Sequence, residues 1–279
     1  GTAEQGNASG ITDKSRRAES YLTNDLTLDW NRCEGQRYFL NRAKEFGCES
    51  IVLFSNTPPV QYTQNGKGFS NQGGVSNLKN DCYDDFAAYM GDVAQYYIDK
   101  GYPVTHISPV NEPQYNWDGG QEGSGWTNDE VARLARELDD ALTERNLSTD
   151  ILLGESGDWE YLYKTKDDAN RSNVMSAFFT PGSSAYVGNL NHVKKLICGH
   201  SYWTDGTWDG MRSVRKQVAQ AATQYGVDVW QSEWSMLGDN YSNTEFVGYD
   251  NATEMDIAFY MSRVIHNDLT VAGVSSWSY

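Results

Sequence analysis

The stretch VTHISPVNEPQYNW, residues 104–117, decides which fold this sequence predicts. Its first half, 104–110, is short, apolar and rich in β-branched residues, as expected of a strand buried inside a sheet. Asn111, Glu112 and Pro113 follow at once, so a carboxylate stands directly at the carboxyl end of that strand. Polar groups at the carboxyl ends of parallel strands commonly build ligand sites. Whether Glu112 is a functional residue or a loop carboxylate depends on what the other strand ends carry.

The rest of the chain alternates helical and strand patterns around this stretch. We expect helices over 35–47, 82–100, 127–146, 211–225 and 257–265, and strands near 51, 104, 151, 196, 228 and 271. Short apolar strands alternating with amphipathic helices predict a parallel α/β sheet covered by helices on its outside. A doubly wound sheet also accommodates six strands, but it normally has a Gly-rich phosphate turn, and no strand end here reads GxGxxG.

Five of the expected strands each deliver polar or aromatic side chains at their carboxyl ends. After the strand at 104–110, the next four place there Glu155, His200 with Tyr202, Glu233, and Trp277. In a (β/α)8 TIM barrel all these ends converge on one face, where the active site lies. One such residue means little, but the repeated pattern predicts about six βα units of a barrel.

Two carboxylates in one pocket are typical of glycoside hydrolysis. One protonates the leaving oxygen, and the other attacks the anomeric carbon or activates water. Taken alone, Glu112 and Glu233 could each be a helix cap or a loop carboxylate. Their polar and aromatic company favours a site: Asn111, His200, Tyr202 and Trp277. Glu155 could equally orient a neighbouring side chain or cap a helix.

Several motifs carry a resemblance to a known family. Asn111-Glu112-Pro113 and the segment QSEW at 231–234 resemble the two catalytic signatures of clan A retaining glycosidases. Within that clan, four segments are similar to glycoside hydrolase family 30: FSNTPPVQYTQNG (54–66), DCYDDFAAYM (81–90), ISPVNEPQYNWDGGQEG (107–123) and GHSYW (199–203). The branch that they most resemble is the endo-β-1,6-galactanases. The resemblance runs from about residue 29 to residue 279.

The resemblance implies a role for each residue at the strand ends. Glu112 would be the general acid/base, Glu233 the nucleophile, and Asn111 would hydrogen-bond the 2-hydroxyl of the sugar. Tyr202 would hydrogen-bond the nucleophile and His200 would line the same wall. A phenol donor favours the ionised carboxylate, and burial favours the protonated acid.

Aromatic side chains are expected to line an elongated groove. Trp277 would form the floor of the subsite of the cleaved sugar. Further rings follow the catalytic strands and could line the groove or merely pack loops: Tyr115, Trp117, Trp126, Trp203 and Trp234. Asn56 falls where many family members have Trp, which removes one aromatic wall.

The resemblance also implies a larger protein. Eight strands complete a (β/α)8 barrel, so we expect residues 1–279 to be an incomplete catalytic barrel domain. Its first two strands and an accessory β-sandwich partner domain would lie outside the chain. Residues 1–30 are small and polar without a sustained period, and they are expected to form a long loop.

Composition limits the partners. The 22 Lys and Arg against 38 Asp and Glu give a net charge of −16, so nucleic acid and anionic membranes are poor partners. No apolar run could span a membrane, and the chain shows no signal peptide. The four His are scattered, and neither a metal nor a cofactor is expected. The family resemblance implies an exported protein: extracellular, cell-surface or periplasmic.

The cysteines leave one question open. Cys198 lies in an apolar strand and is expected to be a small core residue. A disulfide among Cys33, Cys48 and Cys82 is compatible with the sequence, but their spacing does not assign one.

The sequence thus predicts a retaining endo-acting β-glycoside hydrolase that takes a β-linked polysaccharide or oligosaccharide, with β-1,6-galactan as the first choice. Xylan, β-1,6-glucan and glucosylceramide are alternative substrates within the same family. A carbohydrate-binding barrel without activity is a further alternative, although both carboxylates are present here.

Overall fold

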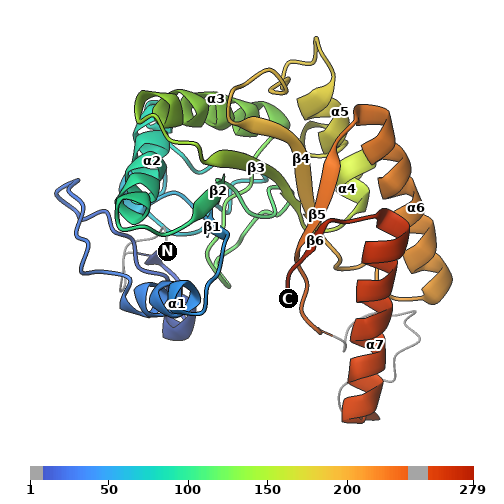
Figure 1. The fold of residues 1–279 in the computed structure, drawn as a ribbon. Coiled ribbons are helices and arrows are strands. Elements are labelled where there is room, and N and C mark those ends of the chain that lie inside the picture. The colour runs from blue at the N-terminus through green and yellow to red at the C-terminus, as the bar shows by residue number, and fades with distance from the viewer. Residues whose placement is uncertain (1–8, 238–250) are drawn as a thin grey trace. The chain divides into compact units, whose positions relative to one another are not determined.

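A computed structural model describes residues 9–237 and 251–279 of the protein (Figure 1). Its parallel strands are β1 (Ile51–Phe54), β2 (Val104–Ser108), β3 (Asp150–Ser156), β4 (Val193–His200), β5 (Asp228–Glu233) and β6 (Ser276–Trp277). They are hydrogen-bonded in chain order, β1-β2-β3-β4-β5-β6. The helices are α1 (Glu34–Glu45), α2 (Tyr83–Asp99), α3 (Asn128–Glu144), α4 (Glu160–Tyr163), α5 (Val174–Phe179), α6 (Trp208–Tyr225) and α7 (Glu254–Asn267). This alternation is that of part of a (β/α)8 barrel, as predicted.

The chain forms two compact units. The first contains Gly1–Leu153 and Val187–Lys194, and the second contains Gly154–Tyr186 and Lys195–Tyr279. β1 and β2 belong to the first unit, whereas β5 and β6 belong to the second. β3 and β4 each begin in the first unit and end in the second.

Helices α2 and α3 lie side by side in the first unit (Figure 1). The apolar face of α3 is buried throughout, at Val131, Leu134, Leu138, Ala141 and Leu142. The helix begins with a capping box, in which Thr127 and Glu130 each bond the other's backbone N–H. β1 pairs in parallel with β2, from Ile51 opposite Val104 to Phe54 opposite Ser108.

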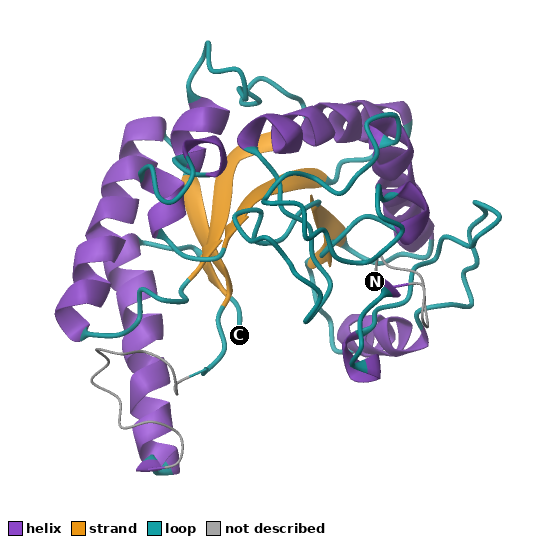
Figure 2. Ribbon diagram, turned by 180° about the vertical axis from the view of Figure 1, so that it is seen from behind, coloured by secondary structure: helices purple, strands orange, loops and turns teal. Residues whose placement is uncertain are grey.

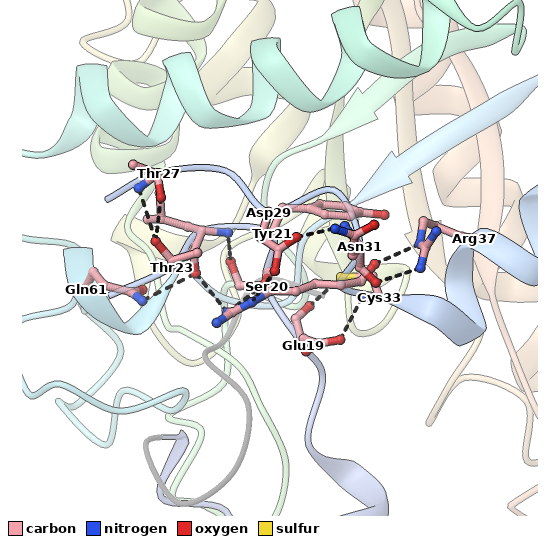
Figure 3. Close-up of polar contacts among 12 residues, drawn as sticks. Glu19, Ser20, Tyr21, Thr23, Thr27, Asp29, Asn31, Cys33, Arg37 and Gln61 are labelled. Atoms are coloured by element: carbon pink, nitrogen blue, oxygen red, sulfur yellow. Dashed lines mark hydrogen bonds and ion pairs between the residues drawn. The ribbon is translucent and has the colours of Figure 1, made fainter. Parts of the chain in front are cut away.

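The segment from residue 9 to α1 has little regular structure but is tightly hydrogen-bonded. It contains one 3-10 turn, Lys14–Arg16, and one isolated bridge between Leu22 and Leu28. Near the start of α1 the backbone N–H of Cys33 donates to Glu19 Oε2 at 2.6 Å (Figure 3). Arg37 Nη2 donates to the carbonyl oxygen of Asn31 at 2.6 Å. These bonds satisfy backbone groups that neither a helix nor a sheet would pair here.

The second unit is built on β4, β5 and β6, with α6 and α7 to one side of β4 and β5 (Figure 2). Six buried residues form its core cluster: Tyr202, Met211, Trp234, Met236, Tyr260 and Val264. α6 begins at Thr207, whose hydroxyl accepts from the N–H of Gly210. It ends at Gly226, which has the left-handed conformation of a helix cap. The core thus holds the helices directly behind the strand ends that carry the predicted site.

The strand predicted near 271 was wrong in its position. Residues Asp268–Ala272 instead form a π-helical turn that continues α7 and ends at Gly273, which has a φ of 73°. The strand itself is only two residues long, with Ser276 opposite Trp230 and Trp277 opposite Gln231. The apolar pattern of 271–274 reflects burial of Ala272 and Val274 rather than strand structure.

The four cysteines are free thiols, and Cys198 is fully buried as expected. None of the helices in the described ranges 9–237 and 251–279 is long and apolar enough to cross a bilayer.

Candidate active site

In the first unit, Glu112 is held by the loop that follows β2. Its side chain is buried and its φ is +38°, a left-handed conformation that non-glycine residues seldom adopt. The backbone N–H of Tyr115 and the indole Nε1–H of Trp117 both donate to the Glu112 carbonyl oxygen at 3.1 Å. Backbone strain of this kind concentrates at functional sites. The loop is therefore built around the conformation of Glu112.

Asn111 is buried immediately before Glu112. Within the described residues, its amide Oδ1 has no hydrogen-bond partner. Buried polar atoms are nearly always paired, so an unpaired amide oxygen needs an explanation. A hydroxyl of a bound ligand would supply the missing donor.

Two of the aromatic rings expected in this unit have different surroundings. Trp117 is largely buried: its ring packs on Gly123, where a Cβ would lie only 2.1 Å from the indole. It still lines a groove of about 670 Å³ together with Tyr115, Asn116 and Gln121. Trp126, by contrast, is buried against Tyr83, so it follows the loop-packing alternative. Loop packing accounts for Trp126.

Asn56 lies two residues after β1 and is half-buried. It belongs to the same unit as Glu112, and its role at the site remains a prediction. Its smaller side chain stands where a tryptophan would have filled more of that end of the strand.

In the second unit, Glu233 is the last residue of β5 and receives a hydrogen bond from a phenol. Tyr202 Oη donates to Glu233 Oε1 at 3.1 Å. The backbone N–H of Ser235 donates to Tyr202 Oη at 3.1 Å and fixes its position. Burial, followed by the nearby Glu233 carboxylate, raises the pKa of Tyr202 to about 12. The phenol therefore stays protonated and remains a donor at any ordinary pH.

Glu155 forms a buried polar cluster with His200. His200 Nε2 lies 2.9 Å from Glu155 Oε2, and both side chains are shielded from solvent. Ser232 Oγ donates to the same carboxylate oxygen at 2.6 Å. Since Ser232 directly precedes Glu233, this cluster ties the end of β4 to the end of β5. Of its two predicted roles, Glu155 has the one that orients a neighbour.

Gly154 explains how Glu155 reaches this position. A Cβ on Gly154 would lie 2.1 Å from the carbonyl oxygen of Cys198 on β4, so only glycine allows the approach. Gly154 has a φ of +117° and Glu155 a φ of +41°, which breaks the regular pleat at the end of β3. The local distortion turns the Glu155 carboxylate toward His200.

The tryptophans of the second unit differ widely in exposure. Trp203 is 52% exposed and has a φ of +54° directly after β4. Trp277 is half-buried, and its Nε1–H donates to Asp268 Oδ2 at 3.0 Å. Trp234 is fully buried and donates to Asp205 Oδ2 at 2.8 Å, so of the two alternatives it packs in the interior. Trp203 and Trp277 remain available to a ligand.

The family model of O-Glycosyl hydrolase family 30 matches residues 1–279. The chain belongs to this family. The resemblance predicted from the strand-end motifs is therefore confirmed.

Individual relatives agree with the family assignment. The chain is 25% identical over 211 residues to a protein of Hypocrea rufa named endo-beta-1,6-galactanase, covering 74% of this chain and 39% of that protein. A solved structure of a conserved exported protein from Bacteroides fragilis matches with a TM-score of 0.90 at 29% identity, covering 96% of this chain and 55% of that one. A family 30 subfamily 8 xylanase from Clostridium acetobutylicum matches with a TM-score of 0.61 at 18% identity, covering 89% and 52%, and supports the fold alone. The chain thus spans only about half the length of these relatives.

Within this family 30 chain the predicted residues fall into two groups. The first unit contains Asn56, Asn111, Glu112 and Trp117. The second contains Glu155, His200, Tyr202, Trp203, Glu233 and Trp277. The predicted contact of Tyr202 with Glu233 is present. The pairing of Glu112 with Glu233 remains a prediction.

Three polar residues at the site were not anticipated from the sequence: Ser232, Ser235 and Asp268. Ser232 and Ser235 flank the expected nucleophile by one and two residues, so their proximity could have been inferred from the QSEW motif. Asp268 gave no such signal, because it lies nine residues before its partner Trp277 in what reads as the end of a helix.

Proposed function

We propose that this protein is a retaining, endo-acting β-glycosidase that cleaves β-1,6-galactan by a double displacement. The observation that carries the proposal is the hydrogen bond from Tyr202 Oη to Glu233 Oε1 at the end of β5. A carboxylate that is stabilised by a fixed donor stays ionised and can act as a nucleophile. Its position in the QSEW segment matches the place where the family carries that group.

Glu233 attacks the anomeric carbon and forms a covalent glycosyl-enzyme in the first step. Tyr202 holds the carboxylate in one orientation through its bond to Oε1. Because the carboxylate is already held in place, less rotational entropy is lost on reaching the transition state. The Glu155–His200–Ser232 cluster supports the same strand ends through the bonds of His200 and Ser232 to Glu155.

Glu112 protonates the glycosidic oxygen and later removes a proton from the attacking water. Its side chain is buried at the end of β2, directly after Asn111. Asn111 Oδ1, which has no donor among residues 9–237 and 251–279, accepts from the sugar 2-hydroxyl. Hydrogen bonds to this hydroxyl that strengthen in the transition state contribute several kcal/mol in such enzymes.

The choice of β-1,6-galactan rests on the relative named endo-beta-1,6-galactanase. Export of the protein is part of the proposal, since the Bacteroides fragilis relative is titled an exported protein. An accessory β-sandwich beside the barrel also remains a prediction for the whole protein.

A panel of polysaccharides tests the proposal. The whole protein is incubated with β-1,6-galactan, β-1,6-glucan, xylan and glucosylceramide, and products are followed by chromatography and by NMR of the newly formed anomeric proton. We expect oligosaccharides of intermediate length from β-1,6-galactan, with the β-anomer formed first. Monosaccharide as the only early product contradicts endo cleavage. The α-anomer as the first product contradicts retention of configuration. Cleavage of another glycan alone contradicts the substrate.

A further inference from the structure

Asp268 is a fully buried carboxylate that joins three elements of the second unit. Arg215 Nε, from α6, donates to its Oδ1 at 2.8 Å. Ser201 Oγ, from the end of β4, donates to its Oδ2 at 2.7 Å, and Trp277 Nε1, from β6, donates to the same oxygen at 3.0 Å. Asp268 and Arg215 are both completely inaccessible to solvent. A single carboxylate thus joins α6 to two segments of the predicted site: the one that carries His200 and Tyr202, and the one that carries Trp277.

We propose that Asp268 is a positioning residue for substrate binding: it fixes the Trp277 indole, and the Ser201 hydroxyl helps to hold the Asp268 carboxylate in place for that contact. The inference rests on the proposed function and assigns a role to a residue that touches no reacting atom. It names the group that sets the orientation of the aromatic floor relative to the nucleophile.

The chemistry of the partners requires an ionised acceptor at this point. An indole N–H and a guanidinium are donors only, and the Ser201 hydroxyl already accepts from Trp159 Nε1 at 3.0 Å. Ser201 therefore turns its own proton toward Asp268. A carboxylate offers four acceptor positions and neutralises Arg215, whose Nη1 also donates to the Thr204 carbonyl oxygen at 2.5 Å.

The backbone supports the same conclusion. Asp268 opens the π-helical turn that follows α7, and insertions of this type frequently lie at functional sites. The N–H of Val274 donates to the Asp268 carbonyl oxygen at 3.1 Å, which returns the chain toward β6. Trp277 then pairs with Gln231, two residues before Glu233. The ring is consequently fixed by the strand register at its backbone and by Asp268 at its Nε1–H.

A purely structural role for the ion pair makes a different prediction. Removing one partner of a buried pair strongly destabilises a protein, wherever the pair lies. Such a loss lowers the unfolding temperature but leaves the turnover of the folded molecules unchanged. A positioning role makes the effect of Asp268 on kcat/KM depend on Trp277. A double-mutant cycle therefore distinguishes the positioning role from the purely structural one.

The cycle uses Asp268→Asn, Trp277→Phe and the double variant of the whole protein, assayed on β-1,6-galactan below the unfolding temperature of each. We expect Asp268→Asn to lower kcat/KM by about 10- to 100-fold, mainly through a higher KM. In the Trp277→Phe background, where no indole N–H remains, the same change should cost less than about 3-fold. Asp139→Asn is the matched control: this buried carboxylate of α3 accepts from the N–H of His192 at 2.7 Å, and its variant should keep wild-type kcat/KM.

The proposal is overturned if the fold-losses of kcat/KM in Asp268→Asn and Trp277→Phe multiply in the double variant. It is also overturned if Asp268→Asn leaves kcat/KM unchanged. If Asp268→Asn does not fold, Ser201→Ala takes its place in the cycle and is judged by the same rule. A wild-type protein without activity on any β-glycan contradicts the proposed function instead. In a protein without activity, positioning is measured by the NMR signal of the Trp277 indole N–H, which is assigned by its loss in Trp277→Phe. Asp268→Asn should shift this signal, and Asp139→Asn should not.

Discussion

Replacing Tyr202 with phenylalanine removes one hydroxyl from the candidate site and keeps the ring in the core cluster. In the wild type this hydroxyl donates to Glu233 Oε1 at 3.1 Å and accepts from the N–H of Ser235. Hydrogen bonds to charged groups contribute about 1.5–3 kcal/mol. At 1.36 kcal/mol per factor of ten, the loss corresponds to a fall of about 10- to 100-fold in kcat/KM at neutral pH.

The pH dependence gives a sharper signature than the rate alone. Because the phenol stabilises the ionised carboxylate, its removal should make the nucleophile easier to protonate. The acid limb of the kcat/KM profile should therefore move to higher pH, by about one to two pH units. Tyr202 itself does not titrate in this range, since its pKa is raised to about 12 by burial and the nearby carboxylate.

The assay is kcat/KM on β-1,6-galactan between pH 4 and pH 9, with Tyr260→Phe as the matched control. Tyr260 is also buried, and its hydroxyl donates to the Asp205 carbonyl oxygen at 2.6 Å. Its variant should lose about 1 kcal/mol of stability and keep the wild-type pH profile. An unshifted acid limb in Tyr202→Phe, or an equal shift in both variants, would refute the role assigned to Tyr202.

Three further predictions test the supports of the site and of the fold. Glu155→Gln replaces an acceptor of the His200 and Ser232 bonds by an amide and should lower kcat by about 10-fold or more with little change in KM; a changed KM with constant kcat would contradict this. Gly154→Ala places a Cβ 2.1 Å from a carbonyl oxygen and should lower the free energy of unfolding in urea by about 3 kcal/mol or more. Gly226→Ala, where the Cβ has no close contact, should lower it by about 1–2 kcal/mol. Equal losses would show that the clash is relieved. Burial raises the pKa of Glu122 to about 7 from 4.5, so this group binds its proton more tightly in the folded state, and its contribution to stability is lost as pH rises from about 4.5 to 7. Glu122→Gln should remove a loss on the order of 3 kcal/mol between pH 5 and pH 8, and a variant with the wild-type pH dependence would disprove the assignment.

The strand ends were readable from the sequence because each depends on neighbouring residues. A buried strand, its abrupt end and the carboxylate that follows lie within about ten residues at both Glu112 and Glu233. The capping box at Thr127 and the helix cap at Gly226 are equally local, and both are present in the structure. Local patterns of this kind fix element types well even without tertiary information.

Side-chain partners distant in the chain could not be read in the same way. Trp234 and Trp126 look like Trp203 in the sequence, since all three follow strands in polar company. Whether such a ring is buried depends on its hydrogen-bond partner. The indole N–H of Trp234 donates to Asp205, 29 residues away, which allows the ring to be buried. Asp268 is hidden for the same reason, because Arg215 lies 53 residues before it. The π-helical turn was missed since its apolar residues also fit a strand.

The central claim is that Glu233 is the nucleophile and Glu112 the acid/base, and the products of azide rescue test it most directly. Glu112→Ala and Glu233→Ala variants of the whole protein are given a dinitrophenyl β-galactobioside, whose leaving group needs no protonation, together with sodium azide. With Glu112 replaced, the glycosyl-enzyme still forms on Glu233 and azide takes the place of the activated water, so we expect the β-glycosyl azide. With Glu233 replaced, azide enters from the vacated face and gives the α-product. An α-azide from Glu112→Ala, or a β-azide from Glu233→Ala, would contradict the assignment of the two glutamates.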